Sequence, residues 1–90
     1  MDELDQLLNR VGKGVFVQFY QSFANERIAD ADIVEMLPQD YTLKSRRSRT
    51  SKARRIFREG RQREALQRIA DSEKTNSEAV ALARRLLAKQ

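Results

Sequence analysis

Arginine and lysine dominate one short stretch of the sequence and give it the chemistry of an anion-binding surface. From Lys44 to Arg63 the chain has ten basic residues and a single acidic one, Glu59. Eight of the ten are arginines, whose planar guanidinium groups match phosphate oxygens with two parallel hydrogen bonds. A surface of this kind attracts polyanions. We therefore predict that the stretch binds nucleic acid through phosphate contacts, with duplex DNA slightly favoured over RNA.

A helical wheel separates these side chains by chemistry if a helix runs from about Ser48 to Glu59. At about 100° per residue, Ala53, Ile56 and Phe57 fall together and form a core face. The opposite side is a basic ridge with one hydroxyl group, formed by Arg47, Arg54, Arg55, Arg58 and Ser51. This ridge is the predicted phosphate-binding surface.

The residues before Ser48 do not fit the same helix. Arg46 and Arg49 would lie on its apolar side, so we expect the helix to begin after them and residues 44–49 to form a mobile basic arm. Arm and ridge together are the predicted interface. Its nucleic-acid-binding residues are Lys44, Arg46, Arg47, Arg49, Lys52, Arg54, Arg55, Arg58 and Arg61.

Two other interpretations of the basic stretch stay open. A charged ridge can be a solvated face, or acidic residues of the first half can neutralise it within one chain or between subunits. The candidates for neutralisation are Asp2, Glu3, Asp5 and Glu35. The alternative function is a protein-interaction module, such as an adaptor, an inhibitor or an antitoxin-like protein, whose basic helix docks on an acidic partner.

Catalytic chemistry has little support in this composition. The sequence contains neither cysteine nor histidine, so disulfides, zinc–thiolate sites and thiol or imidazole catalysis are excluded. Asp30 and Asp32 would lie about 200° apart on a helix, so they cannot chelate one cation together and instead suit the positive end of a helix. No glycine-rich phosphate loop is present. We predict a protein that is not an enzyme and has no catalytic residue, cofactor or metal.

The elements that position these residues are predicted to be helices throughout. Three glycines and one proline leave few residues for the turns of a sheet, so we predict an all-α bundle of four to five helices with a C-terminal helical hairpin. Apolar residues recur every three or four positions from Leu4 to Phe23 and predict one first helix, interrupted at Gly12 and Gly14. Residues 15–20 are rich in strand formers, so a strand is the alternative there.

Breakers and caps predict where the later helices end. Pro38 ends a short helix over residues 29–37, because the residue before a proline avoids the α region. Gly60 is predicted to cap the arginine-rich helix. Thr75 and Glu78 form a capping box that opens the last helix. The final two helices also match a helix-turn-helix template weakly over residues 66–88, although an ordinary hairpin is favoured.

Charge divides the chain into two halves within one predicted domain, residues 1–90. Residues 1–42 carry eight acidic and three basic side chains, whereas residues 43–90 carry five acidic and fifteen basic ones. Because the acidic half would repel phosphates, we assign it to the core and to association, with a homodimer contact at or near Phe16 or Tyr20. No apolar run approaches the roughly 18 residues of a membrane span, so we predict a cytoplasmic protein without a membrane partner.

Overall fold

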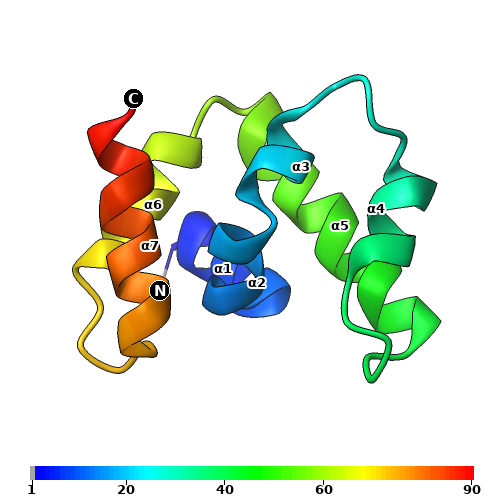
Figure 1. Cartoon of the computed structure of the whole chain (residues 1–90), viewed down its shortest axis with the longest axis horizontal. Helices are drawn as coiled ribbons and strands as arrows, with labels where there is room; N and C mark the ends of the chain where they lie inside the picture. The colour runs from blue at the N-terminus through cyan, green and yellow to red at the C-terminus, as the bar shows by residue number, and fades with distance from the viewer. Residues whose placement is uncertain (1) are drawn as a thin grey trace.

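The structure, a computed structural model, describes residues 2–90 and contains seven helices in this range (Figure 1). They are α1 (Glu3–Val11), α2 (Lys13–Gln18), α3 (Tyr20–Ala24), α4 (Asp30–Met36), α5 (Leu43–Arg58), α6 (Gln62–Ala70) and α7 (Ser77–Ala88). No strand occurs among these residues, which confirms the predicted all-α class and its C-terminal hairpin, α6 and α7. The helices outnumber the predicted four to five because the first is divided into three. Within residues 2–90, none is long and apolar enough to cross a membrane.

The predicted first helix is broken at Gly12 and again at Phe19. Gly12 separates α1 from α2 with a φ of 91°, a left-handed conformation that costs glycine little. Phe19 separates α2 from α3 with φ −109° and ψ 21°. Residues 15–20 lie within or between these helices, so the strand alternative is wrong. The breaks divide the predicted single helix into three short helices that pack around the core.

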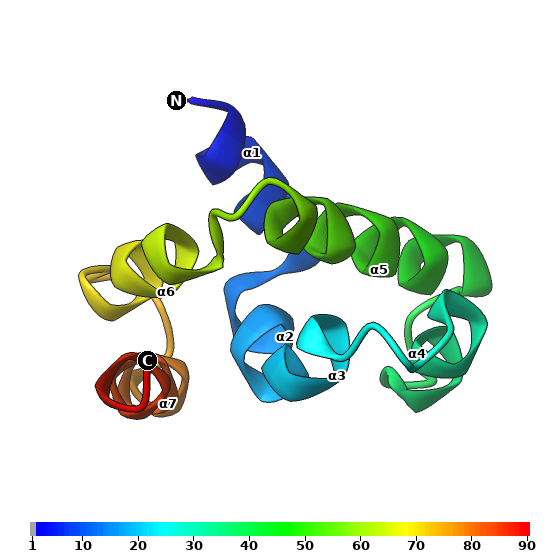
Figure 2. The same cartoon turned by 90° about the horizontal axis from the view of Figure 1, so that it is seen from above.

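The arginine-rich helix α5 is the longest element, and most of the fold is assembled on it. It packs against α1, α3 and α4, and Figure 2 shows α1 on one side of it and α3 and α4 on the other. The α6–α7 hairpin lies beyond the C-terminal end of α5, where α6 contacts α1 and α7 contacts α2. α5 is therefore positioned to reach the ends of several other helices.

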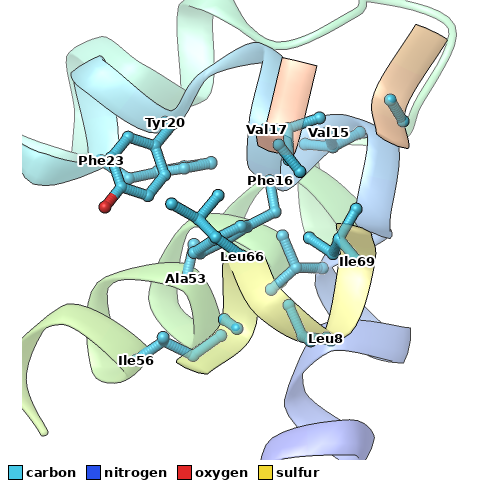
Figure 3. Packing of buried hydrophobic residues seen from close by; sticks show 14 of the residues in the cluster. Leu8, Val15, Phe16, Val17, Tyr20, Phe23, Ala53, Ile56, Leu66 and Ile69 are labelled. Carbon is cyan, nitrogen blue, oxygen red and sulfur yellow. The ribbon is translucent and has the colours of Figure 1, made fainter. Parts of the chain in front are cut away.

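The core lies where α1, α2 and α3 meet α5 and the hairpin (Figure 3). Its central ring is the fully buried Phe16, whose centroid lies 5.7 Å from that of Tyr20 and 6.4 Å from that of Phe23. Ile56 from α5 and Leu66 from α6 are also fully buried against this cluster. The predicted core face of α5 is confirmed at Ile56.

The association contact predicted at Phe16 and Tyr20 is not available in this fold. Phe16 is fully buried and Tyr20 is only 4% exposed, so neither side chain lies on the surface of the chain. Phe16 packs on Phe57 of α5, with 5.7 Å between the ring centroids. The breaks at Gly12 and Phe19 account for this, because the short helices α2 and α3 can turn these rings inward where one straight helix could not.

The N-terminus of α5 lies at Leu43, before the predicted start near Ser48. Thr42 caps it, since its Oγ1 accepts a hydrogen bond from the Ser45 N–H at 3.1 Å. The mobile basic arm predicted for residues 44–49 is therefore wrong, because these residues are regular helix. The arginines of this segment therefore project from a regular helix.

The C-terminus of α5 is closed by Gly60, as predicted. Gly60 has a φ of 68°, and its N–H donates to the Phe57 carbonyl at 3.0 Å. The Arg61 N–H donates to the Ile56 carbonyl, also at 3.0 Å. These two bonds form a Schellman motif, which satisfies the last carbonyls of α5 and redirects the chain into α6.

The α6–α7 hairpin has a longer connection than a helix-turn-helix. Residues 71–76 link the two helices, whereas the DNA-binding motif uses a turn of roughly 3–4 residues. Asn76 caps α7, because its Oδ1 accepts from the Glu78 N–H at 2.7 Å. The Thr75 hydroxyl instead donates to Ser72 Oγ at 2.6 Å, so the predicted capping box is wrong. These features favour an ordinary helical hairpin.

Candidate nucleic-acid interface

The arginines of α5 include an inner set that belongs to the fold. Its members donate hydrogen bonds to backbone carbonyls at or near the C-terminal ends of other helices; these inner arginines are Arg46, Arg49 and Arg54. Carbonyls at a helix C-terminus lack partners within their own helix and lie at the negative end of its dipole. A guanidinium group from a neighbouring helix is therefore a favourable cap.

Arg49 caps α1 and depends on Gly12. Its Nη1 donates to the Val11 carbonyl at 2.7 Å, and its Nε donates to Ser45 Oγ at 3.0 Å. A Cβ at position 12 would lie 2.9 Å from this Nη1, so Gly12 leaves the space that the guanidinium group fills. The Arg49 Cζ also lies 4.0 Å from the centre of the Tyr41 ring, a cation–π contact. Arg49 is thus a structural residue.

Arg54 holds the connection between α3 and α4. Its Nη1 donates to the carbonyls of Phe23 and Asn25, each at 3.0 Å, and its Nη2 donates to the Ile28 carbonyl. Its Nε lies 3.1 Å from Asp30 Oδ1, and its side chain is only 12% exposed. Arg54 therefore does not belong to the solvent-facing ridge on which the helical wheel placed it.

Two further arginines repeat this arrangement. Arg46 reaches α4, where its Nη1 donates to the Val34 carbonyl at 2.9 Å, and its Nε donates to the Tyr41 carbonyl at 3.3 Å. Arg84 of α7 donates to the Ala70 carbonyl at the end of α6 at 3.5 Å, the long limit of a hydrogen bond. Arginine side chains therefore reach the C-terminal ends of α1, α3, α4 and α6.

Acidic residues at the start of the chain neutralise other arginines. Arg68 of α6 lies 2.6 Å from Asp2 and 2.9 Å from Asp5. Arg55 of α5 lies 2.6 Å from Glu3. The Arg68 guanidinium, together with the Asp5 N–H, holds the pKa of the Asp2 carboxyl well below its ordinary value. Neutralisation within the chain, one of the interpretations left open by the sequence, is therefore present at these three carboxylates.

The solvent-facing side of α5 carries three cations that the fold leaves unpaired. Lys44, Arg47 and Arg58 are exposed and form no hydrogen bond or ion pair through their side chains with any of residues 2–90. Ser51 is exposed between them. At about 100° per residue, these four side chains fall within an arc of roughly 60°. Together they form the outer face of α5.

The structure separates the nine predicted nucleic-acid-binding residues into three groups. Lys44, Arg47 and Arg58 keep an unpaired charge on the outer face of α5. The inner arginines donate to backbone carbonyls, which leaves fewer of their N–H groups for a phosphate; they are Arg46, Arg49 and Arg54. The rest bond to neighbouring side chains and are Lys52, Arg55 and Arg61.

Arg63 is an unpaired cation that the sequence-based prediction left out. It is exposed in the first turn of α6 and has no side-chain partner within the described chain. Arg61, which the sequence predicts to bind, pairs with Glu64 at 3.1 Å. Helical spacing distinguishes them, since Arg61 has a carboxylate three residues later whereas Arg63 is followed at three and four residues by Leu66 and Gln67.

The described residues assemble no metal centre. Among residues 2–90, no group of three or more acidic side chains is placed to hold a metal ion. Comparisons of the chain with protein-family models, with curated proteins and with solved structures find no match. The function is therefore inferred from the geometry and charge of this chain alone.

Proposed function

We propose that this protein binds duplex nucleic acid through phosphate contacts from the outer face of α5. The observation that supports this proposal is the alignment of three exposed, unpaired cations, Lys44, Arg47 and Arg58, on one face of a single helix. No group of residues 2–90 pairs with these cations, although many other arginines of the chain are paired. An unpaired row of cations is available to an external polyanion. The Ser51 hydroxyl adds a neutral donor within the row.

The dimensions of the outer face suit several phosphates of one strand. Lys44 and Arg58 are separated by about 21 Å along the helix axis, at 1.5 Å per residue. One strand of DNA places a phosphate roughly every 3.4 Å along the duplex axis, so several phosphates lie within this span. Three unpaired cations therefore predict about three phosphate contacts. The logarithm of the binding constant should then fall with the logarithm of the salt concentration with a slope of about −2.7.

A salt titration of binding to a short labelled duplex tests the proposal. We expect the affinity, measured by fluorescence anisotropy, to fall steeply between about 50 and 200 mM salt. Combining Lys44→Gln, Arg47→Gln and Arg58→Gln should abolish this binding while circular dichroism stays unchanged, because the three side chains have no partner within residues 2–90. Absence of binding by the unmodified protein at low salt would refute the proposal.

A matched control separates the outer face of α5 from total charge. The combined changes Arg10→Gln, Lys74→Gln and Arg85→Gln also remove three positive charges, from exposed residues outside α5. We expect this variant to bind nearly as well as the unmodified protein, because only nearby charges contribute after screening. Equal losses in the two triple variants would show that net charge, and not the outer face, determines binding.

A protein-interaction module is the second candidate, favoured by a groove of about 320 Å³ between α4 and α5. Leu43 is 43% exposed beside it, and the buried Thr50 hydroxyl has no hydrogen-bond partner among residues 2–90. Asp30, Glu35 and Arg47 also line the groove, a mixture of charges that suits a peptide. A protein recovered from native lysate after nuclease treatment, and lost with Leu43→Ser, would support this candidate over nucleic-acid binding.

A further inference from the structure

A cavity lies at the C-terminal end of the outer face of α5 and is not used by the phosphate contacts proposed above. Its volume is about 400 Å³, within the range of small-ligand pockets. α3, the end of α5, the start of α6 and the C-terminal residue surround it. The lining includes Tyr20, Glu26, Phe57, Arg58, Gln62 and Gln90.

One wall of the cavity is aromatic and neutral. Phe57 is partly exposed, and its ring centroid lies 5.0 Å from that of Tyr20 in an edge-to-face arrangement. The Gln90 Nε2 donates to the Tyr20 hydroxyl at 3.3 Å. Burial raises the pKa of this hydroxyl above its ordinary value, so it stays protonated near neutral pH. Tyr20 is almost fully buried, so the partly exposed ring of Phe57 is the part of this wall that favours contact with another flat ring.

Gln62 lines the cavity and carries an unpaired acceptor. Its Oε1 is buried and has no hydrogen-bond partner within residues 2–90. A buried acceptor has lost its bond to water, so a ligand that brings an N–H donor restores the missing interaction. The Glu26 carboxylate also lines the cavity, together with the guanidinium groups of Arg54 and Arg58, and it too accepts hydrogen bonds. The two acceptors, Gln62 and Glu26, suit a ligand that carries N–H donors.

Arg58 joins this cavity to the outer face of α5, because it lines the cavity and is one of the unpaired cations. A strand whose phosphate is held by Arg58 therefore has an adjacent base within reach of the aromatic wall. We propose that the cavity binds the base of an unpaired nucleotide at the end of a strand held on the outer face of α5. This inference rests on the proposed nucleic-acid-binding function and adds a base-binding site to it.

The acceptors of the cavity discriminate among bases. Guanine, adenine and cytosine carry an exocyclic amino group, whereas the only donor on the edge of thymine is its ring N3–H, which lies between two carbonyl oxygens. Gln62 Oε1 and the Glu26 carboxylate accept hydrogen bonds, so amino-bearing bases match them better than thymine does. Guanine, with amino and ring N–H donors side by side, is the base used to test the site.

Three labelled duplexes test the proposal: a blunt one, one with a single guanine overhang, and one whose overhang has the same phosphate and sugar but no base. Since the last two carry equal charge, only the base distinguishes them. We expect the guanine overhang to be bound about tenfold more tightly than the abasic one, as for one stacked base. Excess free guanosine, which is uncharged, should remove this advantage and leave blunt-duplex binding unchanged.

Gln62→Leu should remove the preference for the guanine overhang and leave the affinity for the blunt duplex unchanged. Gln67→Leu is the matched control, because Gln67 is exposed on the same helix and does not line the cavity. If guanine and abasic overhangs bind equally while the blunt duplex still binds, the cavity is not a base site, although the proposed function stands. If no duplex binds, both proposals are overturned. The guanosine competition uses the unmodified protein, so it decides the question even if Gln62→Leu fails to fold.

Discussion

The inner and outer sides of α5 carry the same type of residue and place it in opposite environments. On the inner side, Arg46, Arg49 and Arg54 donate to carbonyls of other helices and loops. On the outer side, Arg47 and Arg58 have no partner within residues 2–90. The number of arginines in a helix therefore does not show how many of them can bind a ligand, because a guanidinium group is available only if the fold leaves it unpaired.

Helix length explains why the inner arginines are needed. The helices α1, α2, α3 and α4 have nine, six, five and seven residues. Each helix leaves about four C-terminal carbonyls without an intrahelical partner, so short helices have a large share of such groups. Arginine offers several N–H donors and a positive charge to these negative helix ends. The long helix α5 supplies these side chains to its short neighbours.

The largest expected difference between the two sides is in the free energy of unfolding. Arg54→Met removes the donors to the Phe23, Asn25 and Ile28 carbonyls and should lower this free energy by about 2–4 kcal/mol. Arg58→Met makes the same chemical change on the outer side and should alter it by less than about 0.5 kcal/mol. Urea denaturation followed by circular dichroism measures both. Equal effects would remove the distinction between inner and outer arginines.

A smaller loss of stability is expected when Gly12, which lies against the side chain of the inner arginine Arg49, is replaced. Gly12→Ala places a Cβ 2.9 Å from Arg49 Nη1 at a residue with φ +91°, so it should lower the free energy of unfolding by about 1–3 kcal/mol. Gly14 is the matched control, because a Cβ there meets nothing within 4 Å and the residue lies in α2. Gly14→Ala should therefore be neutral or stabilise by up to about 1 kcal/mol. Destabilisation by both changes to the same extent would contradict the close approach of Arg49.

The ion pairs at the start of the chain should give the smallest effect, visible in acid. Arg68 lowers the pKa of Asp2, and Arg61 and Arg68 lower that of Glu64. A carboxyl whose pKa is lower in the folded state stabilises it above the unfolded pKa and loses this contribution as the pH falls. The melting temperature should therefore decline below about pH 4. Asp2→Asn should make this decline smaller. Asp32→Asn should leave it unchanged, because Asp32 is exposed and forms no ion pair within residues 2–90.

Local signals in the sequence predicted much of the fold. Apolar periodicity, Pro38 and Gly60 indicated the helices and several of their ends, because these signals act through the backbone of neighbouring residues. The break at Phe19 has no such signal, since phenylalanine neither breaks nor caps helices. The start of α5 was misplaced because Arg46 and Arg49 lie on its apolar side, where arginine is unexpected until carbonyl partners are known.

The candidate interface was predictable as a region but not residue by residue. A helical wheel places Arg54 beside Arg47 and Arg58, because it uses only positions along one helix. What separates Arg54 from them is a set of carbonyls in the α3–α4 connection, which is distant in the sequence. The cavity was not predicted either, because Gln62 and the C-terminal Gln90 come together only through the packing of the hairpin.

The most direct test of the two roles of α5 follows the arginine Nε–Hε signals by nuclear magnetic resonance while duplex DNA is added. The signals of Arg47 and Arg58 should shift progressively with DNA, because these side chains are predicted to bind phosphates. Those of Arg46, Arg49 and Arg54 should stay in place, because the Nε groups of Arg46 and Arg49 already donate to Tyr41 and Ser45, and that of Arg54 is buried 3.1 Å from Asp30. Shifts of the inner signals while the outer ones remain unchanged would contradict the account.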